Sequence, residues 1–431
     1  MRIFLDHGEA YGNLGDDAML IAAHRRILAA LGEVEFIVPC RGGGRLPALS
    51  NTQFIESARL AIPEAIGRLK RFHWIGWLGR LRQPYLQERW VARRERLLSG
   101  SSGWQVTTEA LSRSDALYAV GCGNMNDIAP HVTLLYRSAL YRAARHRGVP
   151  IITSSQGVGP LRHRWSQAVA SRICACSSHF SLRAPLAPID EGSRMDRVGR
   201  APVVGDEAYF LPAAGEAQWA RLLQGHGVRP GSPYLVIHYR AADYVGDIGS
   251  PLEALAEGLR HLAFDGHHVF VPMSVRGHSG SDVAVGEKLR TLLGKSVRFA
   301  NIEPLQDPSL AKALVWRSSG VVALSYHLQV FALSGAIPFV ILTQGRYYFP
   351  KASGMRLLAG TKTPLLDLSI PEAATARVVL AGWMAGRAAQ IADLRASQRR
   401  IEPINTMPVE ALLHHLHFYD KSNKRIQHED G

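Results

Sequence analysis

The chain has 431 residues, of which 47 % are hydrophobic and 20 % charged, and its formal net charge is +14. That length exceeds what one ordinary hydrophobic core holds, so two domains are expected. No run approaches the ~20 apolar residues of a membrane span, and Asp6, His7 and Glu9 interrupt the pattern of a secretory signal. Both observations favour a cytoplasmic protein. The charge predicts a polyanionic partner such as a phosphorylated substrate or an anionic membrane surface, but without a zinc finger, an RNA-recognition signature or a basic coiled coil it does not favour nucleic acid.

The first half of the chain alternates short β-branched runs with longer amphipathic stretches, which is typical of α/β layers. The expected strands are residues 2–6, 34–39, 116–121, 150–155 and 179–183, and the expected helices are residues 16–31, 133–147 and 164–175. The four cysteines form no CxxC pair, so we expect reduced thiols and no metal site.

Residues 55–104 break this rhythm, because they contain no clean strand pattern. Between Arg68 and Leu97 nine basic residues stand against two acidic ones, interleaved with Trp74 and Trp77. An amphipathic segment with Trp on one side and Arg on the other suits an anionic membrane interface. The alternative is a helical insertion whose aromatic side chains pack on the first sheet while its arginines are solvated.

A Pro/Gly-rich break at residues 211–215 precedes a second alternating block. Its expected strands are residues 234–239, 268–272, 297–301, 320–325 and 338–343, with helices that begin near residues 251, 282, 308 and 327. The pattern predicts two Rossmann-like domains facing a cleft, residues 1–212 and 213–370, followed by a helix and a basic tail in residues 371–431. Ligands of open parallel sheets bind at the carboxyl ends of the strands, so the residues that follow strands are the site candidates.

Three glycine turns follow strands in the first block. Glycine permits a close approach of a ligand to the backbone, and a helix N-terminus attracts anions. For the first turn the alternative is that Asp16 caps the helix and the glycines only shape the chain. The three turns would line one rim of the sheet. Their candidate residues are Gly12, Asn13, Gly15, Asp16 and Asp17; Gly123, Asn124 and Asp127; and Gln156, Gly157 and Gly159.

Cationic side chains follow strands in the second block. Arg240 ends one strand, His327 begins a helix after another, and Arg346 and Lys351 follow a third. Each alone is explained by a surface cation near a strand end. Together they predict a rim that can bind a small, highly charged anion.

The order of these motifs resembles the polysaccharide pyruvyl transferase family over residues 8–355. The resemblance is carried by Gly12-Asn13-x-Gly15-Asp16-Asp17-Ala18, Gly121-x-Gly123-Asn124, Ser155-Gln156-Gly157-Val158-Gly159-Pro160, Ser181-Leu182-Arg183, Gly205-Asp206-Glu207-Ala208, and His327, Ala332, Gly335, Pro338 and Lys351.

The resemblance implies a fold similar to the GT-B glycosyltransferases. It also implies transfer of a pyruvyl group from phosphoenolpyruvate to two hydroxyls of a saccharide, giving a ketal and phosphate, during exopolysaccharide or cell-surface polysaccharide biosynthesis. Phosphoenolpyruvate is then a co-substrate and no cofactor is implied. The acceptor is expected to be a lipid-linked or nucleotide-linked saccharide.

The residue roles that the resemblance implies fall on Arg240 and His327, which would meet phosphoenolpyruvate. Arginine binds carboxylate or phosphate bidentately, and histidine transfers protons near pH 7. His327 is thus a candidate general acid or phosphate ligand. Asp16, Asp17 or Asp127 is a candidate base on the opposite wall, Ser325, Arg346 and Lys351 complete the donor side, and Arg183 joins the glycine turns on the acceptor side.

Three positions depart from the family pattern. Ser325 stands where an arginine is usual, which removes one expected cation, and Arg346 is a candidate replacement. Cys122 replaces the middle glycine of the second turn, and Ala184 stands where an acidic residue is common. Two alternatives therefore remain open: a sugar transferase of the same fold that uses a nucleotide-sugar donor, and a non-catalytic saccharide-binding relative.

Overall fold

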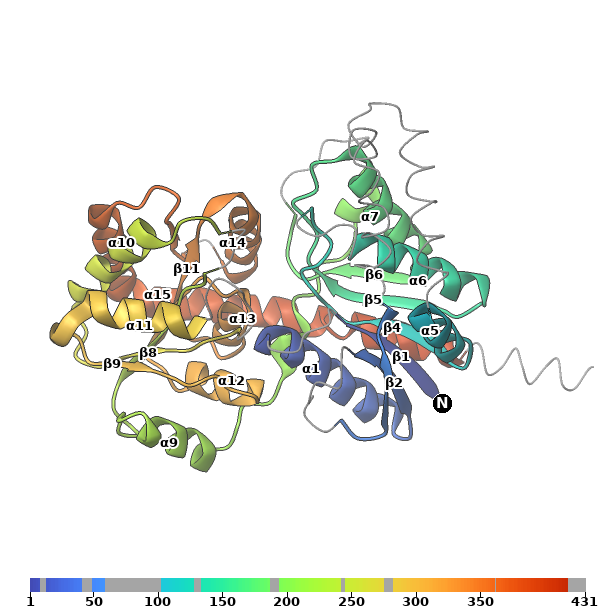
Figure 1. Ribbon diagram of the computed structural model, residues 1–431, viewed down its shortest axis with the longest axis horizontal. Coiled ribbons are helices and arrows are strands. Elements are labelled where there is room, and N and C mark those ends of the chain that lie inside the picture. Colours follow the sequence, from blue (N-terminus) through green and yellow to red (C-terminus); the bar gives the residue numbers. More distant parts are fainter. Residues whose placement is uncertain are drawn as a thin grey trace, which may run out of the picture. The chain divides into compact units, whose positions relative to one another are not determined.

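A computed structural model describes residues 1–7, 13–40, 49–58, 102–127, 133–186, 194–241, 245–274, 282–360 and 362–417. Its strands form two six-stranded parallel sheets with flanking helices (Figure 1). The expected α/β class with two Rossmann-like sheets is confirmed. The expected basic, Trp-rich segment falls largely in residues 59–101, which lie outside the described residues.

The first sheet has the strand order β3-β2-β1-β4-β5-β6. Its central strand is buried on both faces, with Ile3, Phe4 and Leu5 all inaccessible to solvent, which explains the uninterrupted apolar run in the sequence. The elements are β1 (Arg2–Asp6), α1 (Leu14–Leu31), β2 (Glu35–Cys40), β3 (Thr52–Glu56), α5 (Ser102–Ser112), β4 (Ala116–Ala119), α6 (Leu134–His146), β5 (Ile151–Gln156), α7 (Arg164–Cys176), β6 (His179–Leu182) and α8 (Asp196–Gly199).

The second sheet has the strand order β12-β11-β10-β7-β8-β9. The elements of this half are η2 (Glu207–Phe210), α9 (Glu216–Gly225), β7 (Tyr234–His238), α10 (Gly249–Arg260), β8 (His267–Phe270), α11 (Asp282–Leu293), η3 (Gly294–Ser296), β9 (Phe299–Asn301), α12 (Pro308–Trp316), β10 (Gly320–Ala323), α13 (Tyr326–Ser334), β11 (Phe339–Thr343), α14 (Gly345–Ala359), β12 (Leu365–Asp367) and α15 (Ala373–Ile404).

Each sheet has one topological switch point, where the strand order reverses. In the first sheet it lies between β1 and β4, and in the second between β7 and β10. Open parallel sheets bind ligands beyond the carboxyl ends of the strands at such points. The fold therefore directs attention to residues 6–7 and 120–123 in one sheet, and to residues 238–240 and 324–327 in the other.

Internal contacts divide the chain into two compact units that are not continuous in sequence. The first unit contains Met1–Glu9, Ala23–Val204 and Asn405–Gly431, and the second contains Ala10–Ala22 and Gly205–Ile404. The expected ranges differ because they follow sequence order alone. In the structure the N-terminal half of α1 belongs with the second unit: the Leu14 N–H donates to the Met273 carbonyl at 3.0 Å, and Asn13 forms a β-bridge with Ser274.

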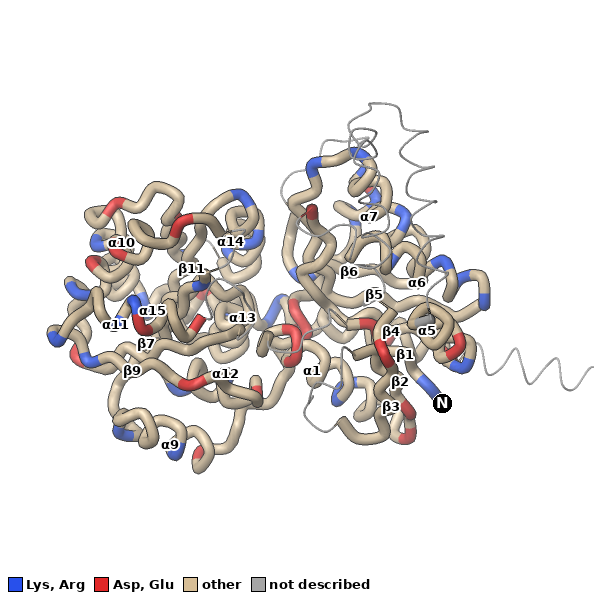
Figure 2. Tube along the Cα trace, viewed as in Figure 1, with Lys and Arg blue, Asp and Glu red and all other residues tan. Residues whose placement is uncertain are grey.

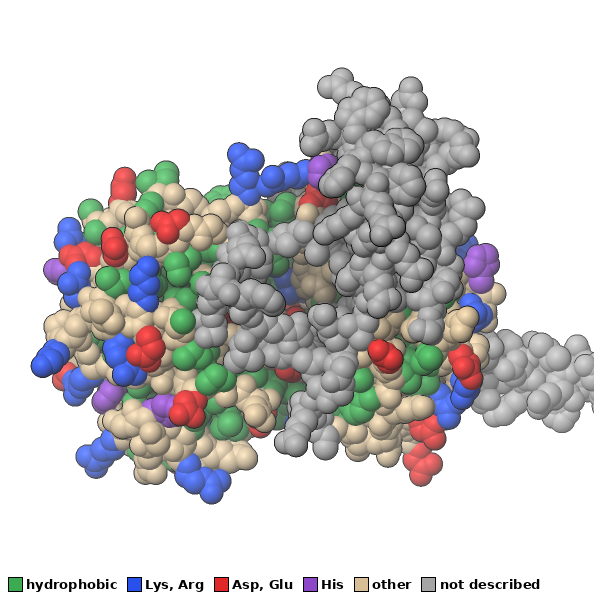
Figure 3. All heavy atoms as spheres, viewed as in Figure 1, with side chains coloured by type: hydrophobic (Ala, Val, Ile, Leu, Met, Phe, Trp, Pro, Cys, Tyr) green, Lys and Arg blue, Asp and Glu red, His purple; other side chains and the backbone are tan. Residues whose placement is uncertain are grey.

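The basic residues are distributed over the helices of both units (Figure 2). On the described part of the face drawn in Figure 3, Lys and Arg side chains alternate with acidic ones and form no continuous basic patch. None of the described helices has the length and apolarity needed to cross a membrane.

Candidate active site

Three neighbouring strands of the second sheet, in the order β10-β7-β8, end at one place. His238 is the last residue of β7, Arg240 follows two residues later, and Ser325 follows β10. The segment after β8 carries Met273 and Ser274. These chain ends lie at the switch point between β7 and β10, so Arg240 and Ser325 fall where this type of sheet binds ligands.

Asp282, the first residue of α11, holds these chain ends together. Its Oδ2 accepts hydrogen bonds from the backbone N–H groups of Met273 at 3.0 Å and Ser274 at 2.8 Å, and from His238 Nε2 at 3.2 Å. The Arg240 guanidinium donates from Nε to Oδ1 at 3.3 Å and from Nη2 to Oδ2 at 3.4 Å. Burial alone would raise the pKa of Asp282, but the hydrogen bond from His238 and the charge and hydrogen bonds of Arg240 oppose burial and lower that pKa to about 2.

His238 is fully buried and both of its ring nitrogens are engaged. Its Nδ1 accepts from the Ser325 N–H at 3.2 Å, so Nε2 carries the proton that is donated to Asp282. Burial lowers the pKa of His238, and the hydrogen bond to Asp282 opposes that shift without cancelling it. His238 is therefore a neutral structural link between β7 and the start of α13.

The first glycine turn contacts His327. A Cβ added to Gly15 would lie 1.8 Å from His327 Nδ1, so the imidazole occupies the space that any side chain at position 15 would need. His327 is 9 % exposed. The structure thus brings together two residues that the sequence analysis singled out 312 positions apart.

Asn13, rather than Asp16, caps the start of α1. The Asn13 Oδ1 accepts from the Gly15 N–H at 3.2 Å, and its Nδ2 donates to Asp16 Oδ2 at 2.9 Å. The N–H groups of Asp16 and Asp17 both donate to the Asn13 carbonyl. This turn belongs to the same unit as His327, which differs from the expectation that Asp16 and Asp17 lie on a wall opposite the cations.

The other two predicted cations lie on α14, which follows β11. Arg346 is exposed in the first turn of that helix. Lys351 contacts the Tyr347 hydroxyl, and its Nζ lies 3.6 Å from the centre of the Tyr347 ring. The contacts around Asp282 thus connect Arg240 with Ser325, whereas α14 presents its cations beside a different strand.

The second and third glycine turns pair with each other beyond β4 and β5. The Gly157 N–H donates to the Cys122 carbonyl at 2.8 Å, and the Gly159 N–H to the Met125 carbonyl at 2.7 Å. The Asp127 carboxylate accepts from the Arg162 N–H. Gly123 and Asn124 are half-buried. These two turns lie side by side at the first sheet, whereas the first turn, which was expected on the same rim, groups with the second unit. Gly12, from the first turn, lies outside the described residues.

A buried polar network lies beneath this rim. Arg137 of α6 is fully buried and pairs with Asp6 of β1, with 3.2 Å between Nε and Oδ2. Its Nη1 donates to the side-chain oxygen of Gln156, whose Nε2 donates to the carbonyls of Val120 and Ser154. Gln156, predicted as a ligand contact, is fully buried and connects β4, β5 and α6.

Arg183 also lies beneath the rim, at 4 % exposure. A Cβ on Gly157 would lie 2.5 Å from Arg183 Nε, so the glycine leaves room for the guanidinium. Gly157 and Arg183, both predicted for the acceptor side, are therefore in direct contact.

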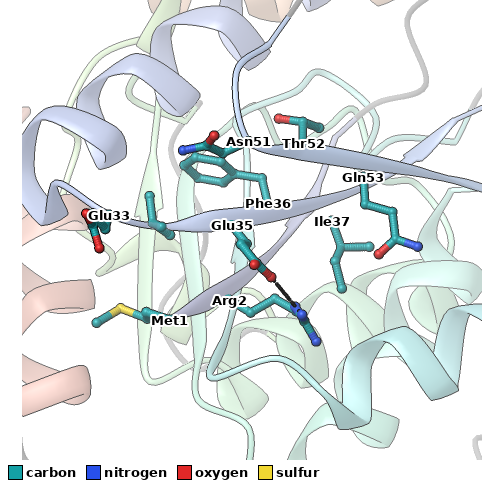
Figure 4. Close-up of a pocket in the computed structure, with 10 residues that line it drawn as sticks. Met1, Arg2, Glu33, Glu35, Phe36, Ile37, Asn51, Thr52 and Gln53 are labelled. Atoms are coloured by element: carbon teal, nitrogen blue, oxygen red, sulfur yellow. Dashed lines mark hydrogen bonds and ion pairs between the residues drawn. The ribbon is translucent and has the colours of Figure 1, made fainter.

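The open depression drawn in Figure 4 lies apart from the strand ends described above. It is lined by residues at the amino ends of β1, β2 and β3, including Met1, Arg2, Glu35 and Thr52. Ligands of parallel sheets bind at the opposite ends of the strands, so this depression is not the candidate site. Among the described residues, no group of three or more His, Cys, Asp or Glu side chains is arranged to hold a metal ion.

Comparison with known proteins gives one family. The sequence model described as polysaccharide pyruvyl transferase matches residues 13–346, which is most of the chain. No protein with a curated function matches the sequence.

Solved structures resemble the whole chain at low identity. They include a UDP-GlcNAc 2-epimerase from Neisseria meningitidis bound to UDP-GlcNAc (TM-score 0.55, 13 % identity, 96 % of this chain and 100 % of that one). Anabaena HepE in complex with UDP-glucose has a TM-score of 0.53 at 14 % identity over 96 % and 99 % of the two chains. S. aureus MnaA with UDP has a TM-score of 0.51 at 13 % identity over 94 % and 96 %. These likenesses show the fold alone, which is the GT-B-like architecture expected from the sequence.

Proposed function

Because the chain belongs to the polysaccharide pyruvyl transferase family, we propose that it transfers the pyruvyl group of phosphoenolpyruvate to a saccharide and forms a pyruvate ketal. The saccharide would serve an exopolysaccharide or another cell-surface polysaccharide. The observation that carries the proposal is the gathering of Arg240, Ser325 and the segment that contacts His327 at the switch point of the second sheet.

Phosphoenolpyruvate carries about three negative charges at neutral pH, so its site requires cations and hydrogen-bond donors. The Arg240 side chain is 16 % exposed and is held from behind by Asp282. It can therefore meet an anion while its orientation is fixed. Arginine is suited to this role because its planar fork binds a carboxylate or phosphate bidentately.

Ketal formation joins two saccharide oxygens to C2 of phosphoenolpyruvate and breaks the bond between C2 and the phosphate oxygen. C3 takes one proton and becomes a methyl group, and inorganic phosphate leaves. We assign to His327 either the protonation of C3 or a hydrogen bond to the departing phosphate, since histidine exchanges protons near pH 7. Asp16, Asp17 and Asp127 remain the candidate bases for the saccharide hydroxyls.

The acceptor side is proposed at the rim formed by Gly123, Asn124, Gly157 and Gly159, with Arg183 beneath it. We propose a lipid-linked or nucleotide-linked saccharide as the acceptor and phosphoenolpyruvate as the co-substrate, with no further cofactor. Arg346 and Lys351 are proposed as additional cations on the donor side, where Arg346 would replace the usual arginine at position 325.

The test is phosphate release from phosphoenolpyruvate by the purified protein in the presence of a panel of saccharide acceptors. We expect release that depends on the acceptor and that falls by roughly 100-fold or more in His327→Ala, the usual size of a general acid–base contribution. Phosphate release no greater than that of His327→Ala with every acceptor would contradict the proposal.

A nucleotide-sugar donor is the second candidate, and Ser325 favours it because that residue removes a cation from the expected donor site. Three of the solved structures with this fold hold UDP, UDP-glucose or UDP-GlcNAc. A rise in melting temperature with UDP-sugars and none with phosphoenolpyruvate would support it. Saccharide binding without turnover of either donor would identify a non-catalytic relative instead.

We also propose peripheral attachment to the inner face of the cell membrane through residues 68–97, on the basis of their Arg and Trp content. The protein is then expected to sediment with anionic liposomes. A variant with Trp74 and Trp77 replaced by Ser should sediment less; equal sedimentation of the variant and the wild type would refute the attachment.

A further inference from the structure

One carboxylate receives hydrogen bonds from two separate chain segments at the donor site, the end of β7 and the residues after β8. Asp282 accepts from the side chain of His238 on β7, from the Arg240 guanidinium just beyond β7, and from the backbone after β8 at Met273 and Ser274. The Asp282 side chain is 2 % exposed. It therefore faces these donors rather than solvent, and it lies behind the residues that meet the ligand.

We propose that Asp282 is the positioning residue of the donor site: it orients the Arg240 guanidinium toward the donor anion and, through His238, fixes the backbone at the start of α13. The inference rests on the proposed function for the identity of that anion. Asp282 itself is not assigned a contact with substrate.

The Arg240 guanidinium is oriented by two contacts with Asp282. Its Nε and Nη2 both face Asp282, one toward each carboxylate oxygen, at 3.3 and 3.4 Å. Two contacts of this kind fix the plane of the guanidinium as well as its position. An arginine whose plane is already fixed loses less conformational freedom when it binds an anion.

Two hydrogen bonds of His238 connect Asp282 with the start of α13. Since Asp282 accepts a hydrogen bond from His238 Nε2–H, the unprotonated Nδ1 accepts the hydrogen bond of the Ser325 N–H at 3.2 Å. Ser325 directly precedes Tyr326 and His327 in α13. The tautomer of one buried histidine thus permits a hydrogen bond to the residue that directly precedes the helix carrying His327.

The backbone of Met273 and Ser274 connects Asp282 with the first glycine turn. Their N–H groups bind Asp282, and the same two residues hold Leu14 and Asn13 by backbone pairing. Gly15 follows directly and lies against the imidazole of His327. Asp282 is accordingly connected both to the start of α13 and to the turn that contacts the His327 ring.

Both oxygens of Asp282 are required as acceptors, so side-chain shape alone is not sufficient. In Asp282→Asn the amide NH₂ must replace one carboxylate oxygen. Placed at Oδ2 it would face the N–H donors of Met273, Ser274 and His238, and placed at Oδ1 it would face Arg240 Nε. Either orientation sets a donor against a donor at unchanged side-chain volume.

The decisive experiment is a double-mutant cycle on ligand binding, measured by calorimetry with phosphoenolpyruvate and separately with UDP-glucose. The proteins are the wild type, Arg240→Ala, Asp282→Asn and the double variant. We expect Asp282→Asn to weaken donor binding at least 10-fold in the wild-type background and less than 2-fold when Arg240 is already absent. Equal losses in both backgrounds would show a general structural role and overturn the inference.

Asp265→Asn is the matched control, since it is the same substitution on an almost fully exposed side chain of the second unit. It should leave donor affinity unchanged. In steady-state assays Asp282→Asn should raise KM for the donor through Arg240 and lower kcat through the segments that hold His327.

A measurement on the wild-type protein tests the inference if Asp282→Asn does not fold. Nitrogen-15 NMR of the wild type at pH 7.5 should show a neutral His238 protonated on Nε2, with the signal assigned by its absence in His238→Asn. Protonation on Nδ1 would overturn the inference.

The outcomes separate the two proposals. If the wild type binds UDP-glucose but not phosphoenolpyruvate, the proposed function fails, while the cycle measured with UDP-glucose still decides the role of Asp282. If phosphoenolpyruvate binds and the cycle is additive, the function stands and the positioning role fails. Absence of binding to both ligands would refute both proposals.

Discussion

Gly15 and His327 are in direct contact: a single methyl group on residue 15 would lie 1.8 Å from His327 Nδ1. No side chain fits in that distance, so glycine is required there by packing against the imidazole. The requirement for a glycine in the first turn thus has a physical reason that involves a residue in the other half of the chain.

Gly15→Ala should therefore displace the imidazole of His327. We expect pyruvyl transfer to fall roughly 100-fold, close to the loss in His327→Ala, because a misplaced acid–base group contributes little. The measurement is acceptor-dependent phosphate release. Gly382→Ala on α15 is the control, since an added Cβ there meets nothing within 4 Å. Full activity of Gly15→Ala would show that the position of His327 is irrelevant to turnover.

Gly157→Ala should act on the other substrate. The added Cβ would overlap the Arg183 guanidinium, with 2.5 Å to Nε, and Arg183 is too buried to move into solvent without disturbing the rim. We expect KM for the saccharide to rise about 10-fold or more while the affinity for phosphoenolpyruvate is unchanged. Gly225→Ala, which meets no atom within 4 Å, is the matched substitution. An unaltered saccharide KM would remove Arg183 and Gly157 from the acceptor side.

Arg137→Met should destabilise the first unit, because it leaves the buried Asp6 carboxylate without its guanidinium partner. Breaking a buried pair on one side costs about 3–5 kcal/mol of the free energy of unfolding. Urea unfolding measures this loss. The double variant Arg137→Met/Asp6→Leu should recover part of it, since no uncompensated charge then remains. A double variant less stable than Arg137→Met would contradict this account.

His268 on β8 should make the second unit sensitive to mild acid. It is 2 % exposed, and neither ring nitrogen has a hydrogen-bond partner among the described residues. Burial lowers its pKa from 6.5 to about 4. Between these values the unfolded state binds the proton and the folded state does not, so stability rises with pH in this window and about 3 kcal/mol is lost as pH falls from 6.5 to 4.

His268→Phe should remove that pH dependence, because phenylalanine binds no proton. The neighbouring Phe264 ring already provides an aromatic contact for the new side chain. Unfolding free energies measured from pH 6.5 to 4 should decline less steeply in the variant than in the wild type. The exposed His146 provides the control substitution, His146→Gln, which should leave the slope unchanged. Identical slopes for His268→Phe and the wild type would refute the assignment.

Most of the central strands were predictable from the sequence, since a parallel strand covered on both faces is an unbroken apolar run. The edge strands were not. In β3 only Ile55 is buried while Gln53 and Phe54 are exposed, and β12 has just three residues. Helix α14 was missed because Pro350 and adjacent aromatic residues interrupt the usual helical pattern.

The candidate site was predictable only in part. Glycines and cations after strands identified Gly15, Arg240 and His327, but Asp282 was assigned no role beyond beginning a helix. Its partner His238 lies 44 positions earlier and is an ordinary strand residue in sequence. Their relationship exists only once β7 and β8 are neighbours, which no local pattern encodes.

The division of α1 between the two units has a consequence for how this enzyme class can be rearranged. A fragment cut at Gly205 would leave behind the strip Ala10–Ala22, and with it the pairing to Ser274 and the glycine that accommodates the His327 ring. Neither the segment before Gly205 nor the segment after it can therefore be exchanged alone. Chimeras that swap donor preference between relatives must transplant two distant stretches of gene together, and recombination at the obvious midpoint would separate them.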